Sequence, residues 1–227
     1  MSLPRVIVVT GTDTGVGKTV TTAALAAVLE TRGRRVVVYK PCQTGASVGD
    51  SDVLEIERLS GVRHAEARVV LLEPMAPVAA AELDGVSLPS LAAHAERIAD
   101  LSVDADHVLV EGSGGLLVEL DGDGGTIADL AALTGPDTAV LVVARPALGT
   151  LNHTALTLEA LERRGIAVLG TVIGSWPESP GPVESSNLRR FELSKHPLLA
   201  TLPENSSRLP LALFRGEAVR WFDGLPI

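Results

Sequence analysis

The chain alternates between short, continuously apolar runs and longer segments in which apolar residues recur at three- and four-residue steps. The short runs predict strands buried on both faces, at Val6–Thr10, Arg35–Tyr39, His107–Val110, Ala139–Val143 and Ile166–Ile173. The periodic segments predict helices at Thr19–Arg32, Ser90–Leu101, Thr126–Leu133 and Asn152–Arg164. This alternation predicts a doubly wound, mostly parallel α/β sheet with helices on both faces, and with ligands at the carboxyl ends of the strands.

The remaining stretches carry weaker patterns. Ser175–Ser186 is rich in Pro, Ser and Gly and is expected to be a long loop, and Pro74–Pro77 is expected to be a bend. We expect one more short strand at Leu198–Leu202 and a helix at Leu211–Trp221. The length of 227 residues fits a single α/β domain over residues 1–227.

Composition narrows the possible functions. Apolar residues form 46% of the chain but aromatic residues only 3%, so the core must be built from Val, Leu, Ile and Ala. The formal net charge is −9 and no basic stripe is visible, which argues against a nucleic-acid partner. No apolar run approaches the roughly 20 residues of a membrane span, and the first residues lack a charged leader with a cleavage site. We therefore expect no membrane partner and a cytoplasmic location.

The strongest chemical signal is GTDTGVGKT at residues 11–19, between the first predicted strand and an Ala-rich helix. Gly15 and Gly17 can take positive φ, so successive N–H groups can face a phosphate at the helix start. Lys18 would reach the β- and γ-phosphate oxygens, and the Thr19 hydroxyl would contact Mg²⁺. The loop is one residue longer than the usual spacing. It predicts a P-loop NTPase-like nucleotide site formed by Thr12, Asp13, Thr14, Gly15, Val16, Gly17, Lys18 and Thr19.

The second predicted strand ends in a lysine, Lys40, followed by Pro41, which favours extended geometry for the residue before it. A lysine at a buried strand end needs an anionic partner, so substrate or γ-phosphate binding competes with a simple snorkelling side chain. Thr44 would add a hydroxyl. Cys42, the single cysteine, is expected to be a packing residue, and it excludes an internal disulfide.

Carboxylates are placed where a metal ion would lie. Glu111 follows the third predicted strand and opens the run EGSGG, so it is either a metal-orienting acid or an ordinary acidic strand end. Asp50 could be the N-cap of the next helix, whereas Asp52 is available for Mg²⁺.

One further helix start carries polar groups, after the fourth predicted strand. There Thr150 and Asn152 either bind an anion such as a carboxylate or only cap the helix. His153 is expected on the helix surface.

Taken together, these motifs resemble the dethiobiotin synthase family. The resemblance rests on GTDTGVGKT at 11–19, YKPCQTG at 39–45, the aspartates at 50 and 52, EGSGG at 111–115 and LGTLNHT at 148–154. The elongated phosphate loop is itself a feature of that family. The resemblance implies an ATP-dependent cyclo-ligase of biotin synthesis that makes dethiobiotin, ADP and phosphate from 7,8-diaminopelargonate and CO₂. It further implies carbamate and carbamoyl-phosphate intermediates, Mg²⁺, ATP as co-substrate, and a homodimer.

Carried over by position, the family's motifs assign roles to residues of this chain. The metal ligands would be Thr19, Asp52 and Glu111, and the catalytic residues Lys18, Lys40 and Thr14. The substrate contacts would be Lys40, Thr44, Ser113, Gly149, Thr150, Leu151 and Asn152. Many members place Asn after the fifth strand to read adenine, whereas this chain continues Ile173-Gly174-Ser175. Backbone contacts to the base are therefore expected from Gly174, Pro203, Glu204 and Asn205.

Two other function classes use the same phosphate loop. A partition-type ATPase switch would carry a signature lysine early in the loop, where this chain has Thr12, Asp13 and Thr14. A small-molecule kinase would not require Lys40 together with the EGSGG and LGTLNHT segments. The cyclo-ligase is therefore the favoured prediction, and the alternatives are another P-loop phosphoryl-transfer enzyme or a partition-type ATPase switch.

Overall fold

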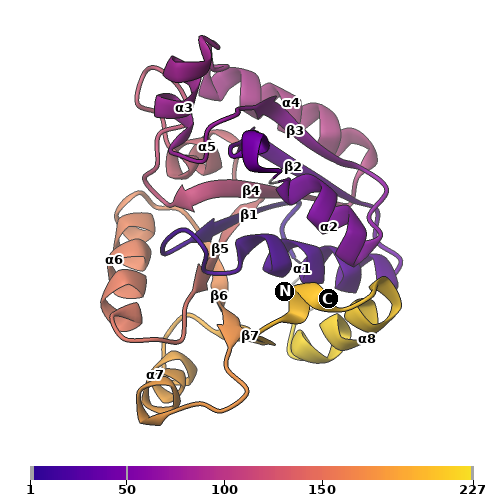
Figure 1. Ribbon diagram of the computed structural model, residues 1–227, viewed down its shortest axis with the longest axis vertical. Coiled ribbons are helices and arrows are strands. Elements are labelled where there is room, and N and C mark those ends of the chain that lie inside the picture. The colour runs from indigo at the N-terminus through magenta and orange to yellow at the C-terminus, as the bar shows by residue number, and fades with distance from the viewer. Residues whose placement is uncertain (1–2, 50, 226–227) are drawn as a thin grey trace.

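The core of the fold is one parallel sheet, in a computed structural model that describes residues 3–49 and 51–225. Its strand order is β3-β2-β4-β1-β5-β6-β7, and every neighbouring pair is parallel (Figure 1). The strands are β1 Val6–Gly11, β2 Val36–Gln43, β3 Ala65–Val70, β4 His107–Gly115, β5 Thr138–Ala144, β6 Val168–Trp176 and β7 Leu198–Pro203. Parallel strands bring all their carboxyl ends to one edge, which is where the predicted site lies.

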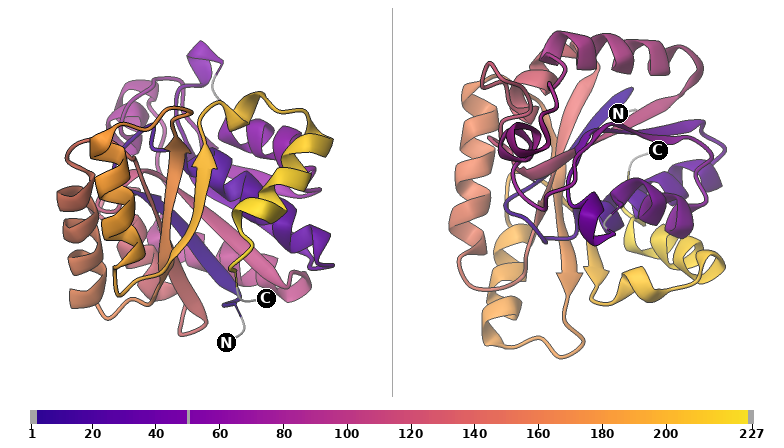
Figure 2. Two further views of the ribbon diagram at one scale, coloured as in Figure 1. Left: turned by 90° about the horizontal axis from the view of Figure 1, so that it is seen from below. Right: turned by 45° about the horizontal axis from the view of Figure 1, so that its top comes forward.

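Helices cover both faces of this sheet (Figures 1 and 2). They are α1 Lys18–Thr31, α2 Asp52–Ser60, α3 Pro77–Asp84, α4 Leu91–Asp104, α5 Ile127–Leu133, α6 Thr150–Arg163, α7 Pro182–Glu192 and α8 Leu211–Trp221. One apolar cluster joins the sheet to α1, α2 and α8, and a second joins the opposite face to α4, α5 and α6. Across residues 3–49 and 51–225, no helix has both the length and the apolar character that crossing a bilayer requires.

The central strand β1 and helix α1 are packed on several sides and position the phosphate loop between them. Every residue of β1 is buried, so the phosphate loop that follows it starts from a fixed position. Four alanines of α1 are fully buried, and their small side chains let this helix pack closely between the sheet and its neighbours α2 and α8. The helix that begins with Lys18 is therefore held on several sides.

The long apolar strands and periodic helices lie where the sequence predicts them, with ends displaced by a few residues. Among the strands and α-helices of the described residues, β3, α3 and α7 were not predicted. The expectation of one long loop over Ser175–Ser186 is wrong at both ends. β6 continues to Trp176, and α7 begins at Pro182, whose fixed φ suits the first helical position. The Glu184 carboxylate accepts the Gly181 N–H at 2.9 Å and closes the helix start.

Candidate active site

The phosphate loop has the backbone that its glycines predict. Gly15 has φ 71° and Gly17 has φ 97°, both in the left-handed region that glycine tolerates. Gly17 is the N-cap of α1 and no side chain caps it, so the first N–H groups of the helix remain available for an anion. The loop is fixed to β5 by the Thr12 N–H, which donates to the Val143 carbonyl at 2.9 Å. The start of α1 therefore has backbone N–H groups that could bind an anion.

Lys18 folds back across this loop. Its ammonium donates to the carbonyl oxygens of Asp13 at 3.1 Å and Gly114 at 2.7 Å. Burial lowers the pKa of Lys18 below its ordinary value, because the charged ammonium loses water there. Two neutral carbonyls are weak partners for a buried cation, so an arriving phosphate oxygen would be a better one.

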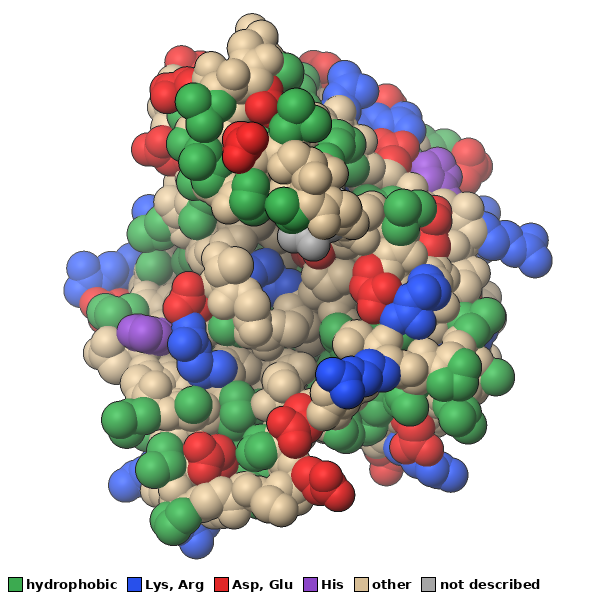
Figure 3. Space-filling model, viewed as in Figure 1, with side chains coloured by type: hydrophobic (Ala, Val, Ile, Leu, Met, Phe, Trp, Pro, Cys, Tyr) green, Lys and Arg blue, Asp and Glu red, His purple; other side chains and the backbone are tan. Residues whose placement is uncertain are grey.

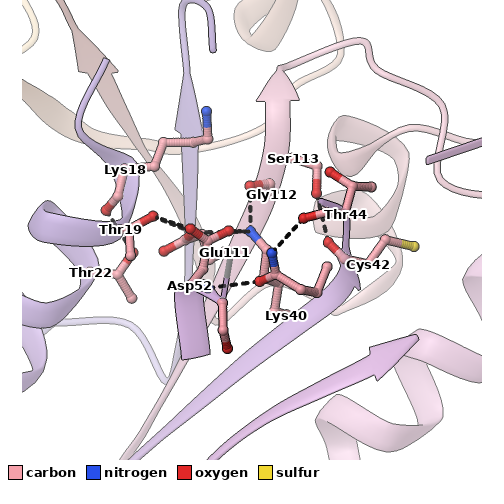
Figure 4. A network of polar contacts seen from close by, with 12 residues as sticks. Lys18, Thr19, Thr22, Lys40, Cys42, Thr44, Asp52, Glu111, Gly112 and Ser113 are labelled. Atoms are coloured by element: carbon pink, nitrogen blue, oxygen red, sulfur yellow. Dashed lines mark hydrogen bonds and ion pairs between the residues drawn. The ribbon is translucent and has the colours of Figure 1, made fainter. Parts of the chain in front are cut away.

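Three oxygen-bearing side chains converge beside Lys18 (Figure 4). The Thr19 Oγ1 lies 2.8 Å from Asp52 Oδ1 and 3.1 Å from Glu111 Oε1. Glu111 is fully buried, and its second oxygen, Oε2, has no hydrogen-bond partner among the residues described. Among the described residues, no group of three or more His, Cys, Asp or Glu side chains is arranged so that it could hold a metal ion by itself. Two carboxylates and one hydroxyl form a hard oxygen set, of the kind Mg²⁺ completes with water and phosphate.

Lys40 lies between the two carboxylates. Its Nζ is 2.7 Å from Asp52 Oδ2 and 3.1 Å from Glu111 Oε1, and the residue is only 2% exposed. Burial opposes the charged form, yet the carboxylates of Glu111 and Asp52 raise the pKa of Lys40 above its ordinary value. The same ammonium lowers the pKa of Asp52 against the effect of its burial. Lys40 is therefore a buried cation, not a snorkelling side chain, and its partners here are protein carboxylates.

Gln43 positions Asp52, a role that the sequence did not predict. Gln43 is the last residue of β2 and is 3% exposed. Its Oε1 accepts the Asp52 N–H at 2.8 Å, while its Nε2 donates to the Thr44 carbonyl at 2.8 Å. A polar residue at the end of a buried strand was the available signal, since burial requires such groups to find partners.

Nearby residues settle two further expectations. The helix cap of α2 is Ser51, whose hydroxyl accepts the Leu54 N–H, and Asp50 lies outside the described residues. Cys42 is a packing residue as predicted, since it is fully buried in the second apolar cluster, and this burial raises the pKa of its thiol to about 11.

These residues enclose a cavity of about 350 Å³, a normal size for a small-molecule site. In the space-filling view a hollow opens near the middle of the face, with a basic side chain inside it (Figure 3). Of the predicted site residues, the cavity is lined by Thr14, Gly15, Gly17, Lys18, Thr19, Lys40, Thr44, Asp52, Glu111 and Ser113. Segments far apart in sequence therefore form one cavity, and both lysines and both carboxylates line it.

The predicted carboxylate-binding residues do not line this cavity. Thr150, Leu151 and Asn152 form the first turn of α6, where Gly149, with φ 89°, is the N-cap. No side chain caps this helix, so simple capping by Thr150 or Asn152 is not what these residues do. The Thr150 hydroxyl is buried and has no hydrogen-bond partner within residues 3–49 and 51–225, whereas Leu151 and Asn152 are exposed.

The predicted base-binding residues lie at the ends of β6 and β7. Gly174 packs directly against the phosphate loop, since a Cβ on it would lie 2.1 Å from the Val16 carbonyl oxygen. The N–H of Glu204 donates to the Trp176 carbonyl at 2.7 Å and joins the two strand ends. Asn205 follows with φ 61°. Gly174 thus connects these strand ends to the phosphate loop.

A sequence model described as an AAA domain matches residues 5–208. The ATP-dependent dethiobiotin synthetase BioD of Mycobacterium avium (strain 104) is 52% identical over 218 residues, covering 96% of this chain and 95% of that protein. The chain belongs to the dethiobiotin synthetase family. The synthetase of Mycobacterium marinum (strain ATCC BAA-535 / M) is 50% identical over 219 residues, with the same coverage of both chains. Family membership confirms the predicted resemblance and makes the chain an ATP-dependent ligase.

Solved structures are similar in fold. The cell-division ATPase MinD of Pyrococcus furiosus has a TM-score of 0.59 at 21% identity, covering 95% of this chain and 89% of that chain. The signal-recognition-particle receptor FtsY of Elizabethkingia anophelis, in complex with GDP, has a TM-score of 0.57 at 17% identity, covering 98% and 64%. At these identities the likeness confirms the P-loop NTPase-like α/β fold and nothing finer.

Proposed function

We propose that this chain catalyses the ATP-dependent carboxylation and ring closure of 7,8-diaminopelargonate with CO₂, giving dethiobiotin, ADP and phosphate. The observation that carries this proposal is the meeting of Lys18 and Lys40 with an acidic metal-type cluster in one cavity, in a chain that is 52% identical to a dethiobiotin synthetase over nearly its whole length. Carbamate, phosphate and metal-bound anions repel one another, so a reaction that joins them needs cations at fixed positions.

The residues present fit a magnesium ion. Thr19, Asp52 and Glu111 would hold it. The buried Glu111 Oε2 supports this assignment, because it has no partner in the part of the chain that the structure describes and such an oxygen needs one. When bound, Mg²⁺ would neutralise charge on the β- and γ-phosphates. Lys40 shares these carboxylate oxygens. If Mg²⁺ binds the carboxylate oxygens of Asp52 and Glu111, the Lys40 ammonium would be free to pair with a carbamate or γ-phosphate oxygen.

The reaction would proceed in three steps. First, one amine attacks CO₂, loses a proton and becomes a carbamate. Second, the γ-phosphoryl group passes from ATP to a carbamate oxygen and ADP is left. Third, the second amine attacks the carbonyl carbon, loses a proton and expels phosphate, and the new C–N bond closes the ring. Lys18 and the loop N–H groups, with Thr14, would hold the phosphates. Lys40 would hold the carbamate in line with the γ-phosphate, and Thr44 and Ser113 would orient the amines.

A homodimer would complete the site. The start of α6 offers free N–H groups and Thr150 and Asn152 for the substrate carboxylate, yet it lies outside the cavity of its own chain. Exposed leucines flank it: Leu148 is 84% exposed and Leu156 is 57% exposed. An apolar surface of this kind suits a second copy, whose cavity would receive this helix start.

The nucleobase would lie at the ends of β6 and β7. Gly174, Pro203, Glu204 and Asn205 would contact it mainly through their backbone, since no asparagine follows β6 in this chain. Backbone contacts read the base less strictly than a dedicated side chain. A panel of nucleoside triphosphates would measure this preference.

The deciding experiment is incubation of the protein with the diamine, ¹⁴C-bicarbonate and Mg·ATP. We expect acid-stable label in a cyclic urea, together with ADP that forms only when the diamine is present. The matched control is Lys18→Met, which should abolish both. ATP hydrolysis that ignores the diamine, or label that is lost in acid, would contradict the proposal and favour a nucleotide switch or a different phosphoryl-transfer enzyme.

A further inference from the structure

The loop between β5 and α6, residues 145–149, is fastened on two sides. On one side the Arg145 guanidinium forms an ion pair with the Asp13 carboxylate of the phosphate loop. On the other side the Asn187 side-chain amide of α7, which is 7% exposed, donates to the carbonyls of Pro146 at 2.8 Å and Ala147 at 3.3 Å. The loop therefore cannot shift without changing its contact with the phosphate loop, with α7, or with both.

Asp13 is connected to the phosphate-binding groups as well as to Arg145. Its Oδ1 accepts the Thr14 N–H at 2.7 Å, and its backbone carbonyl accepts the Lys18 ammonium at 3.1 Å. The hydrogen bond from the Thr14 N–H lowers the pKa of Asp13 most, and the Arg145 guanidinium lowers it further. The carboxylate therefore stays charged. A phosphate that draws Lys18 away would act directly on the residue that holds Arg145.

Arg145 also lies close in sequence to the start of α6. Only Pro146–Gly149 separates it from Thr150, and this short segment is pinned by Asn187. A change at Arg145 therefore reaches the first turn of α6. The Arg145 Nε is buried without a partner among the described residues, so the ion pair with Asp13 is the main polar contact that fixes this side chain.

We propose that Arg145 is a positioning residue that couples nucleotide binding at the phosphate loop to the order of residues 145–152. With nucleotide bound, the Asp13–Arg145 pair holds the start of α6 in its binding geometry. The role of that helix start in binding the substrate carboxylate rests on the proposed function, whereas the coupling itself needs only nucleotide. In the proposed homodimer, the nucleotide in one subunit would thereby influence diamine binding in the other.

The first test is hydrogen exchange with and without a non-hydrolysable Mg·ATP analogue. Both partners of the pair are partly exposed, at 37% for Arg145 and 49% for Asp13, so removing it should leave folding intact. In the wild-type chain we expect the analogue to slow exchange in 11–19 and, by at least about threefold, in 145–152. In Arg145→Ala the analogue should still slow exchange in 11–19, but it should no longer slow exchange in 145–152. Equal protection of 145–152 in both proteins would overturn the proposal.

Matched variants separate positioning from a general loss of structure. Arg163→Ala removes a comparable exposed ion pair, with Glu159, near the far end of α6, and should keep the wild-type protection. Arg145→Lys should restore part of it, because the positive charge is kept. Asp13→Ala, which also frees the Thr14 N–H, should likewise remove the protection of 145–152, and adding Arg145→Ala to it should cause no further loss in that segment. Additive losses in the double variant would contradict a direct coupling.

A second readout uses the diamine. In the wild-type chain the analogue should lower the Kd for the diamine by at least about fivefold. In Arg145→Ala it should leave this Kd unchanged. If the wild-type chain does not bind the diamine at all, the proposed function fails, while the exchange experiment still decides the coupling. If the diamine binds and the tightening survives in Arg145→Ala, the coupling fails and the proposed function stands.

Discussion

Gly174→Ala should lower kcat/KM for ATP although it changes no charged group. Gly174 is buried at the end of β6, and a Cβ there would lie 2.1 Å from the Val16 carbonyl oxygen and 2.8 Å from Val143 Cγ1. Its φ is not in the left-handed region, so the backbone tolerates alanine and only space is limiting. The nearest atom is backbone of the phosphate loop, which cannot rotate away as a side chain can.

The size of the effect follows from this distance. Real Cβ contacts essentially never fall below 3.0 Å, so the loop and β6 must separate by nearly 1 Å. Misplacement of about 1 Å can reduce turnover by about 10²-fold, because catalysis depends on the alignment of reacting atoms. Overpacking of this kind also destabilises a core by about 1–3 kcal/mol. We therefore expect kcat/KM for ATP to fall about 100-fold while the protein remains folded at 25 °C.

The assay is steady-state ADP release, with urea unfolding of the same samples. The control is Gly216→Ala in α8, where a Cβ would meet nothing within 4 Å. This change should leave kcat/KM unaltered and raise the free energy of unfolding by up to about 1 kcal/mol, because alanine favours the helix. Wild-type kinetics in folded Gly174→Ala would refute the claim that this close contact fixes the phosphate loop.

Two further predictions concern buried ionisable groups. Glu111→Gln keeps the shape but removes a charge from the metal-type cluster, so the midpoint of a Mg²⁺ titration of activity should rise at least about 10-fold; an unchanged titration would remove Glu111 from the site. The Tyr39 hydroxyl lies 2.6 Å from His94 Nδ1, and burial lowers the pKa of His94 to about 4. Because an unfolded histidine binds its proton near pH 6.5, stability should be full above that pH and fall by about 2 kcal/mol between pH 7 and pH 5. Urea unfolding of His94→Phe should lack this component, and an unchanged slope would show that His94 is not its source.

The sequence was sufficient for the central strands, because long β-branched runs leave little choice of structure. It was insufficient for β3, whose residues AEARVV carry Glu66 and Arg68 at a half-exposed sheet edge. Only pairing with β2 makes this segment a strand. The start of α7 was hidden by prolines, of which Pro182 begins the helix and does not break it.

The sequence predicted many of the residues that line the cavity, but not the contacts between them. Glycine spacing identified the phosphate loop, and strand ends indicated Lys40 and Glu111. The ion pairs of Lys40 with Asp52 and Glu111 were not predictable, because they join three segments that are far apart in the sequence. The Asp13–Arg145 pair escaped for the same reason. Such contacts depend on the sheet order and not on local sequence.

The role of Lys40 can be isolated by one substitution. Lys40→Met keeps an unbranched side chain of similar length and removes the ammonium that lies between Asp52 and Glu111. Loss of one partner from a buried ion pair costs about 3–5 kcal/mol, so the melting temperature must be recorded to show that the variant is folded. Folded Lys40→Met then reports on the reaction alone.

The most direct measurement is single-turnover formation of the cyclic urea by folded Lys40→Met, with the Kd of the Mg·ATP analogue measured in parallel. We predict that the rate falls by about 10²–10³-fold, as expected when a cation aimed at developing charge is removed, while the Kd changes by less than about threefold. A rate close to wild type would contradict the central claim that Lys40 holds the carbamate against the γ-phosphate.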